Sequence, residues 1–216
     1  MLQMIKTIAF IVTTLFPIIN PMGGAPAFLH LTRDSSRKER LALARRVALY
    51  SLVMLIGTFL IGSSVLSLFG ITLPIVQVGG GLVVISMGWA MLNQNGDEDS
   101  KEIGRVADAA PPLHKAFYPL TMPMTVGPGT IATAITLGAN APAPGGGRLA
   151  LALLEAAVAS LLLSIYIFVS YAFFSRSSKL LGPNAMKVVT QLTAFLLTCI
   201  GLQIVWNGVS ALIHTL

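Results

Sequence analysis

The stretch that decides the fold is FPIINPMGGAP, residues 16–26, which places three prolines inside an apolar run. A second stretch of the same kind, YPLTMPMTVGP, occupies residues 118–128. An offset of 102 residues aligns the two stretches and superimposes three prolines and one methionine, beginning with Pro17 on Pro119. Since proline removes a backbone donor and clashes with the preceding helical turn, both stretches predict a broken helix.

The composition places these breaks in a membrane. Hydrophobic residues make up 55% of the chain and charged residues 10%, whereas soluble domains carry about 25% charged residues. We therefore expect an integral membrane protein in contact with the lipid bilayer. A helix broken at membrane depth is tolerated only where protein or a water-filled cavity satisfies its backbone groups. Two breaks at matching positions of two half-chains are typical of a transport site.

Hydropathy predicts an all-α transmembrane fold with six spans and a single membrane domain over residues 1–216. The domain would consist of a first repeat (1–92), an acidic cytoplasmic linker (93–114) and a second repeat (115–216), with a tight turn near Phe69 and Gly70. The six predicted spans cover residues 4–32, 47–68, 71–92, 116–137, 149–174 and 188–213.

The distribution of basic residues predicts the orientation. Twelve of the 14 lysines and arginines follow the first, third and fifth spans, so the positive-inside rule places both termini on the periplasmic side. This bias also explains the net charge of +6 without a nucleic-acid partner. Each half contains three spans, so we expect two inverted three-helix repeats, each with one broken helix. A re-entrant hairpin at either break would change this span count.

Several stretches of the chain resemble the MarC family of inner-membrane proteins. They are NPMGGAPAFLHLT (20–32), FGITLP (69–74) with GGGL (79–82), and YPLTMP (118–123) with GPGTI (127–131). The resemblance covers essentially the whole chain. It implies a six-span protein of the bacterial inner membrane, related to the LysE-type transporter group. One branch, SnatA, is described as carrying small neutral amino acids such as glycine and alanine, coupled to an ion gradient.

The breaks are the candidate substrate site. We expect a new helix to begin after each break, near Ala25 and near Gly129, and two helix N-termini at the midplane would suit a substrate carboxylate. The alternative is that the prolines only kink two helices and the glycines only permit close packing. The candidate substrate-binding residues are Asn20, Pro21, Gly23, Gly24, Pro26, Thr121, Pro123, Thr125, Gly127, Pro128, Gly129 and Thr130.

Glu155 is the acidic residue that lies well inside a predicted span. A carboxyl group in lipid is costly and is a functional hypothesis by default, so Glu155 is the candidate for coupling to Na⁺ or H⁺. The alternative is a position near the external interface, where it would pair with Arg148, seven residues earlier. The histidines lack metal-ligand spacing, so we expect neither a metal nor another cofactor.

Other function classes remain as alternatives to small-solute transport. An exporter of drugs or other metabolites needs a larger, more aromatic cavity, but only 7% of residues are aromatic and few lie in spans near the breaks. No enzyme motif of the HExxH or GxSxG type and no ATP-binding motif occurs, so we do not expect an enzyme. A non-transporting membrane accessory protein and a homo-oligomer both remain open.

Overall fold

The computed structural model describes residues 2–33, 35–93, 114–139 and 147–214. Across these residues the fold is all-α, as predicted, and contains no strand. Most of the predicted linker lies outside the described residues. The elements are α1 (Leu2–Ile19), α2 (Pro21–Leu31), α3 (Arg37–Leu68), α4 (Leu73–Asn93), η1 (His114–Ala116), η2 (Phe117–Thr125), α6 (Pro128–Ala139) and α7 (Gly147–Ile213).

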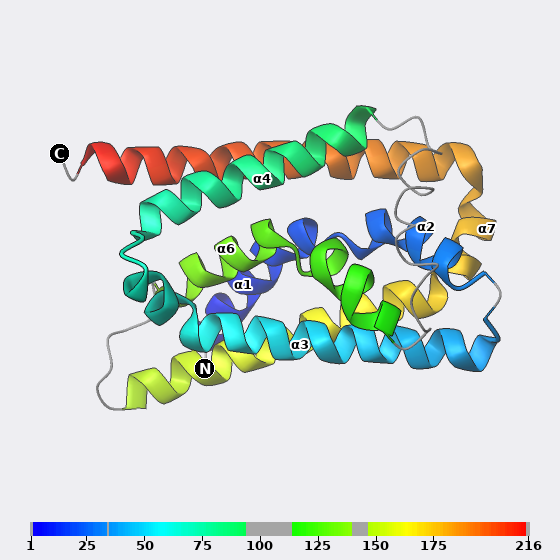
Figure 1. The fold of residues 1–216 in the computed structure, drawn as a ribbon, viewed down its shortest axis with the longest axis horizontal. Coiled ribbons are helices and arrows are strands. Elements are labelled where there is room, and N and C mark those ends of the chain that lie inside the picture. The colour runs from blue at the N-terminus through cyan, green and yellow to red at the C-terminus, as the bar shows by residue number, and fades with distance from the viewer. Residues whose placement is uncertain (1, 34, 94–113, 140–146, 215–216) are drawn as a thin grey trace.

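Five helical stretches in the described part of the chain are long and apolar enough to cross a membrane. They are Leu2–Ile19, Arg37–Leu68, Leu73–Asn93, Ala150–Phe173 and Lys187–Ile213. The last two belong to α7, which reverses direction between them (Figure 1). The span predicted at 116–137 is divided among η1, η2 and α6, because the second proline stretch interrupts it.

The helix α3 is longer at its start than the span that hydropathy predicted over residues 47–68. The helix begins ten residues before the predicted span, at a capping box in which Ser36 and Glu39 satisfy each other's backbone N–H groups. This first part carries basic residues, which a hydropathy scale excludes from a span. At the other end, Gly70 (φ 68°) forms the predicted tight turn into α4.

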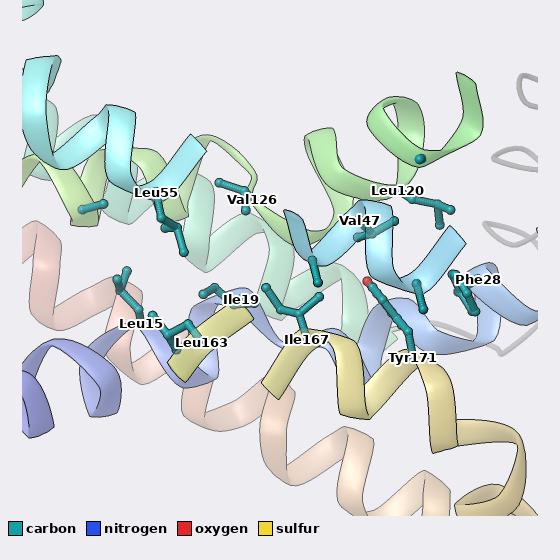
Figure 2. Close-up of a cluster of buried hydrophobic side chains, with 14 of the residues drawn as sticks. Leu15, Ile19, Phe28, Val47, Leu55, Leu120, Val126, Leu163, Ile167 and Tyr171 are labelled. Carbon is teal, nitrogen blue, oxygen red and sulfur yellow. The ribbon is translucent and has the colours of Figure 1, made fainter. Parts of the chain in front are cut away.

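The helices form two outer pairs around an inner layer (Figure 1). The first part of α7 packs on α3, and its second part packs on α4. Between them lie α1, α2, η2 and α6, and the main apolar cluster joins these elements to α3 and α7 (Figure 2). The beginning of α1 and the end of α7 lie at the same end of the molecule (Figure 1).

Glycines bring α4 and the second part of α7 into backbone contact. A Cβ added at Gly81 would lie 2.8 Å from the Gly201 carbonyl oxygen, and one at Gly88 would lie 2.9 Å from the Ala194 carbonyl oxygen. Residue numbers fall along α7 as they rise along α4, so the two helices are antiparallel. Such close approach increases the van der Waals contact between the helices. This contact is a main source of helix association in lipid, because lipid tails are as apolar as the side chains and the hydrophobic effect does not drive helices together there.

Candidate functional site

The first break consists of one residue, Asn20, between α1 and α2. Its φ of 36° is left-handed, a conformation that asparagine tolerates better than most residues. Its N–H donates to the Phe16 carbonyl at 3.3 Å, and its own carbonyl accepts from the Gly24 N–H at 3.4 Å. The prediction that the next helix begins near Ala25 was wrong. It begins at Pro21, because a proline fits the first helical position, where no N–H is needed.

The second break is longer and occupies the nine residues of η2. Its backbone is extended at Tyr118 (φ −120°, ψ 126°) and at Met122 (φ −119°, ψ 125°). Each of these residues precedes a proline, whose ring disfavours the helical region for the residue before it. After η2 the chain returns to a regular helix at Pro128, which confirms the predicted start of α6 near Gly129.

Two threonines satisfy carbonyl groups within the second break. The Thr121 hydroxyl donates to the Ala116 carbonyl at 2.7 Å, and the Thr125 hydroxyl donates to the Leu120 carbonyl at 2.6 Å. Both side chains are buried. The irregular backbone therefore keeps hydrogen-bond partners inside the protein, as a non-helical segment in a membrane requires.

The first turn of α2, which follows the first break, approaches the second break at the hydroxyl of Tyr171, which comes from α7. This hydroxyl shares a hydrogen bond of 2.7 Å with Thr125 Oγ1. Since the Thr125 proton already goes to Leu120, Tyr171 is the donor. A Cβ added at Gly24 of α2 would lie 2.9 Å from the same hydroxyl. Gly24, Thr125 and Tyr171 are called the junction below.

An aromatic contact fixes the junction tyrosine. Its ring stacks on Phe28 of α2, with centroids 4.7 Å apart and planes 11° apart. Tyr171 is 1% exposed, and Figure 2 shows its side chain pointing from α7 into the cluster beside Val47 and Phe28. A second stack, Phe16 on Tyr166 at 4.3 Å, lies one turn before Asn20. The expectation of few aromatic residues near the breaks was therefore wrong.

The amide of Asn20 connects the first break to another helix. Its Nδ2 donates to the Met91 sulfur of α4 at 3.4 Å. The polar residues of the two breaks thus have different neighbours: Asn20 contacts α4, whereas Thr125 contacts α7.

Several predicted site residues serve local structure or packing instead of the junction. Gly129 and Gly80 bring α6 close to α4, since a Cβ added at Gly129 would lie 3.7 Å from the Gly80 carbonyl oxygen. Gly127 lies against the Pro123 carbonyl, where an added Cβ would be 2.6 Å from the oxygen. Thr130 is buried at the first turn of α6.

Three further predicted residues belong to α2. Pro21 is its first residue and is buried. Gly23 and Pro26 follow in the same helix, and their surroundings lie outside what the structure describes.

Glu155 lies in α7, away from the junction. Its side chain is buried, with 7% exposed. It precedes Tyr171 by sixteen residues, or about 24 Å of helix. The side chain of Arg148, its candidate partner, is outside the described residues. Among the described histidine, cysteine and acidic residues, no group of three could hold a metal ion.

The sequence interpretation missed Tyr171, and a signal for it exists. Ser160, Ser164 and Tyr171 recur at spacings of four and seven residues, which place them on one face of a helix. All three are buried in the structure. A hydroxyl-bearing face on an otherwise apolar span indicates contact with polar groups inside the bundle.

The junction presents neutral hydrogen-bonding groups. A hydroxyl both donates and accepts, and the first N–H groups of α2, the helix that contains Gly24, lack partners within their own helix. This set of groups can bind a small polar solute, including a carboxylate.

Comparison with known proteins places the chain in a family. The profile described as "MarC family integral membrane protein" matches residues 5–213. The chain belongs to the MarC family of integral membrane proteins. The MarC match includes both breaks and every residue of the junction.

Curated relatives in the MarC family cover the full length of the chain. An inner membrane protein MarC of Citrobacter koseri is 29% identical over 223 residues, which cover 100% of this chain and 99% of the relative. The proteins of the same name from Escherichia coli (strain ATCC 8739) and Salmonella typhimurium (strain LT2) are 27% and 28% identical, with the same coverage. No solved structure is significantly similar.

Proposed function

We propose that this protein is a secondary transporter of the bacterial inner membrane that moves small solutes with the energy of an ion gradient. The substrate class that fits best is small neutral amino acids, such as glycine and alanine. The observation that carries this proposal is the junction, where Gly24, just after the first break, and Thr125 of the second break meet Tyr171 inside an apolar bundle. Irregular backbone and buried hydroxyls are costly in a membrane, and transporters place them at their binding sites.

The chemistry of the junction favours a small zwitterion. The first turns of α2 and α6 offer N–H groups and partial positive charge to a carboxylate. The hydroxyls of Thr125 and Tyr171 can exchange their mutual hydrogen bond for bonds to the solute. The close approach of Gly24 to Tyr171 favours solutes with small side chains.

The proposal includes six spans in two inverted repeats. An apolar cluster in the structure supports it, because six of its seven members form equivalent pairs at an offset of 113 residues, the offset that carries Gly88 onto Gly201. Residues equivalent under a two-fold axis meet one another only near that axis. The pairs are Val84 with Leu197, Met87 with Ile200, and Met91 with Ile204.

The paths of the half-helices also support inverted repeats. In Figure 1, α2 runs to the right and α6 to the left, away from the middle of the molecule. Both chain ends would then be periplasmic. A reporter enzyme that is active only in the periplasm, fused after residue 216, would be active. Activity of a cytoplasmic reporter at the same position would contradict this topology.

Transport is tested with the purified protein in proteoliposomes. We expect saturable uptake of radiolabelled glycine or alanine that requires an imposed Na⁺ or H⁺ gradient. Thr125→Val should lower this uptake at least about tenfold, because it removes a hydroxyl at the junction. Thr133→Val is the matched control, since Thr133 is buried in α6 and donates only to the Gly129 carbonyl. No uptake under either gradient, or equal uptake by both variants, would contradict the proposal.

Glu155 is the proposed coupling residue in this scheme. Its buried carboxyl group can bind the driving ion away from the substrate. We expect Glu155→Gln to abolish uptake against a concentration gradient while exchange of labelled for unlabelled substrate continues. Loss of both activities, or of neither, would remove Glu155 from the coupling mechanism.

Export of larger aromatic compounds is the second candidate function. The stacks of Phe28 on Tyr171 and of Phe16 on Tyr166 favour it, because aromatic faces bind flat apolar molecules. A thermal-shift screen separates the two candidates. Stabilisation by glycine or alanine supports the first, and stabilisation by aromatic drugs alone supports the second. If neither class stabilises the protein, an accessory role is favoured.

A further inference from the structure

The first part of α7 packs against α3 through a face that carries hydroxyl groups. Ser164 defines the register of this seam, because its hydroxyl donates to the Ala48 carbonyl of α3 at 2.8 Å. Along α7 the same face continues to Tyr171 in one direction and to Ser160 in the other. One end of this face therefore lies at the junction.

The register places two further serines opposite each other. Ser51 follows Ala48 by three residues, or about 4.5 Å, and Ser160 precedes Ser164 by four residues, or about 6 Å. The helices are antiparallel (Figure 1), so both steps lead in the same direction along the seam. Ser51 and Ser160 thus lie at nearly the same level, and both are 0% exposed.

Neither hydroxyl of this pair has a hydrogen-bond partner in the structure. Several threonine hydroxyls in the described residues differ from this pair, because they donate to the carbonyl four residues earlier. Examples are Thr32, Thr133, Thr136, Thr193 and Thr198. Buried hydroxyls without protein partners are generally satisfied by ordered water. Two of them at one level of one seam indicate a shared polar occupant.

We propose that the seam between α3 and α7 is a water track that begins at Ser51 and Ser160 and leads past Ser164 toward the junction, from which it is separated by Ile167, a side chain that is 0% exposed and belongs to the main apolar cluster. Its length from Ser160 to Tyr171 is eleven residues, or about 16 Å. The hydroxyls of Ser51 and Ser160 can each donate to one water molecule and accept from another, whereas the Ser164 hydroxyl donates to the Ala48 carbonyl and can only accept from water. Glu155 stands about 140° around the helix from Ser160 and is not part of the track.

The track points from the side of the junction toward the end of the molecule where α7 begins. Under the predicted orientation this end is periplasmic. The presence of water is testable without any substrate, although the role of the track as a path for solute rests on the proposed function.

Thiol accessibility tests the track directly. The single native cysteine, Cys199, is exposed and is first replaced by serine. Ser51→Cys and Ser160→Cys are then treated in membranes with a charged, membrane-impermeant methanethiosulfonate reagent, applied to each side in turn. Two control positions lie on the same helix: Leu163→Cys is buried among apolar side chains, and Leu161→Cys is exposed on the outer surface.

We expect both serine positions to react at least about tenfold faster than either control, because a charged reagent enters water-filled paths and not lipid or packed core. The reaction should occur from the side on which α7 begins. Rates no higher than those of the Leu163→Cys control would overturn the proposal. So would equal reaction at all four positions, which would indicate general opening of the bundle.

Alanine variants provide a second measurement should a cysteine variant fail to fold. If water satisfies the hydroxyls, Ser51→Ala and Ser160→Ala remove hydrogen bonds and lower the melting temperature. If the hydroxyls are dry and unpartnered, the same changes raise it or leave it unchanged, and the track is overturned. If the cysteines of Ser51→Cys and Ser160→Cys react with the reagent but the protein takes up no amino acid, the track is retained and the proposed function is rejected.

Discussion

The two helix breaks share a proline spacing but differ in form. In each break two prolines stand four residues apart, yet the first interrupts the helix at one residue and the second forms a nine-residue irregular segment. The intervening residues account for this difference. The second break contains Thr121 and Thr125, whose hydroxyls satisfy two carbonyls, whereas the first has Asn20, which adopts a left-handed conformation. The prolines determine where a helix breaks, and their neighbours determine how far the break extends.

The breaks also contribute different chemistry to the junction. The helical turn after the first break supplies Gly24, which has no side chain, and the second break supplies the hydroxyl of Thr125. Variants that add a side chain to one break or remove a hydroxyl from the other test this division.

The largest effect is expected from Gly24→Val. The added side chain meets the hydroxyl of Tyr171, and the tyrosine cannot retreat because its ring is buried and stacked on Phe28. Overpacking of this kind costs about 1–3 kcal/mol, and we expect a lower melting temperature together with loss of uptake. Gly57→Val is the control, since a Cβ at Gly57 meets nothing within 4 Å. Equal melting temperatures for the two variants would show that the protein does not need a residue without a side chain at position 24.

The next effect concerns the hydroxyl of the second break. Thr125→Val keeps the side-chain shape but removes the hydroxyl that donates to the Leu120 carbonyl, and it leaves the Tyr171 hydroxyl without its acceptor. Unsatisfied buried groups cost about 1–3 kcal/mol. Thr133→Val should cost less, because the Gly129 carbonyl keeps its backbone bond within α6. Thermal unfolding in detergent measures both variants, and a larger loss for Thr133→Val would contradict the assignment.

The sequence predicted the positions of the breaks, the start of α6 and the turn at Gly70, because proline and glycine act on the backbone next to them. It did not predict the start of α2, since a proline fits equally well before a helix and in its first turn. The role of Gly129 was also not predictable. The neighbouring residues in the sequence do not show whether a glycine faces a ligand or packs against another helix.

The junction itself depends on contacts that no local pattern encodes. Thr125 and Tyr171 are separated by 46 residues, and Asn20 and Met91 by 71. Such contacts follow from how the helices pack, which periodicity constrains only by selecting a face. The hydroxyl-bearing face of α7 was visible in the sequence, but its partner was not.

A moderate effect is expected at Asn20, where two substitutions separate backbone from side chain. Asn20→Gly keeps access to the left-handed conformation and loses the side-chain amide, including its contact with Met91. Asn20→Ala loses the same contact and also holds a Cβ in a conformation that costs about 1–2 kcal/mol. We expect the alanine variant to melt at a lower temperature than the glycine variant. The reverse order would show that the first break does not depend on the conformation of Asn20.

The smallest effect is expected from Tyr171→Phe. The phenylalanine ring retains the stack on Phe28, and Thr125 still donates to Leu120, so about 0.5–1.5 kcal/mol is lost. Because Thr125→Val removes the same bond between the two hydroxyls, the double variant should lose less stability than the sum of the single losses. Strict additivity would show that the tyrosine and the second break act independently. If the Tyr171 hydroxyl also binds solute, the KM for uptake rises in Tyr171→Phe while the melting temperature changes little, which distinguishes recognition at the junction from its packing.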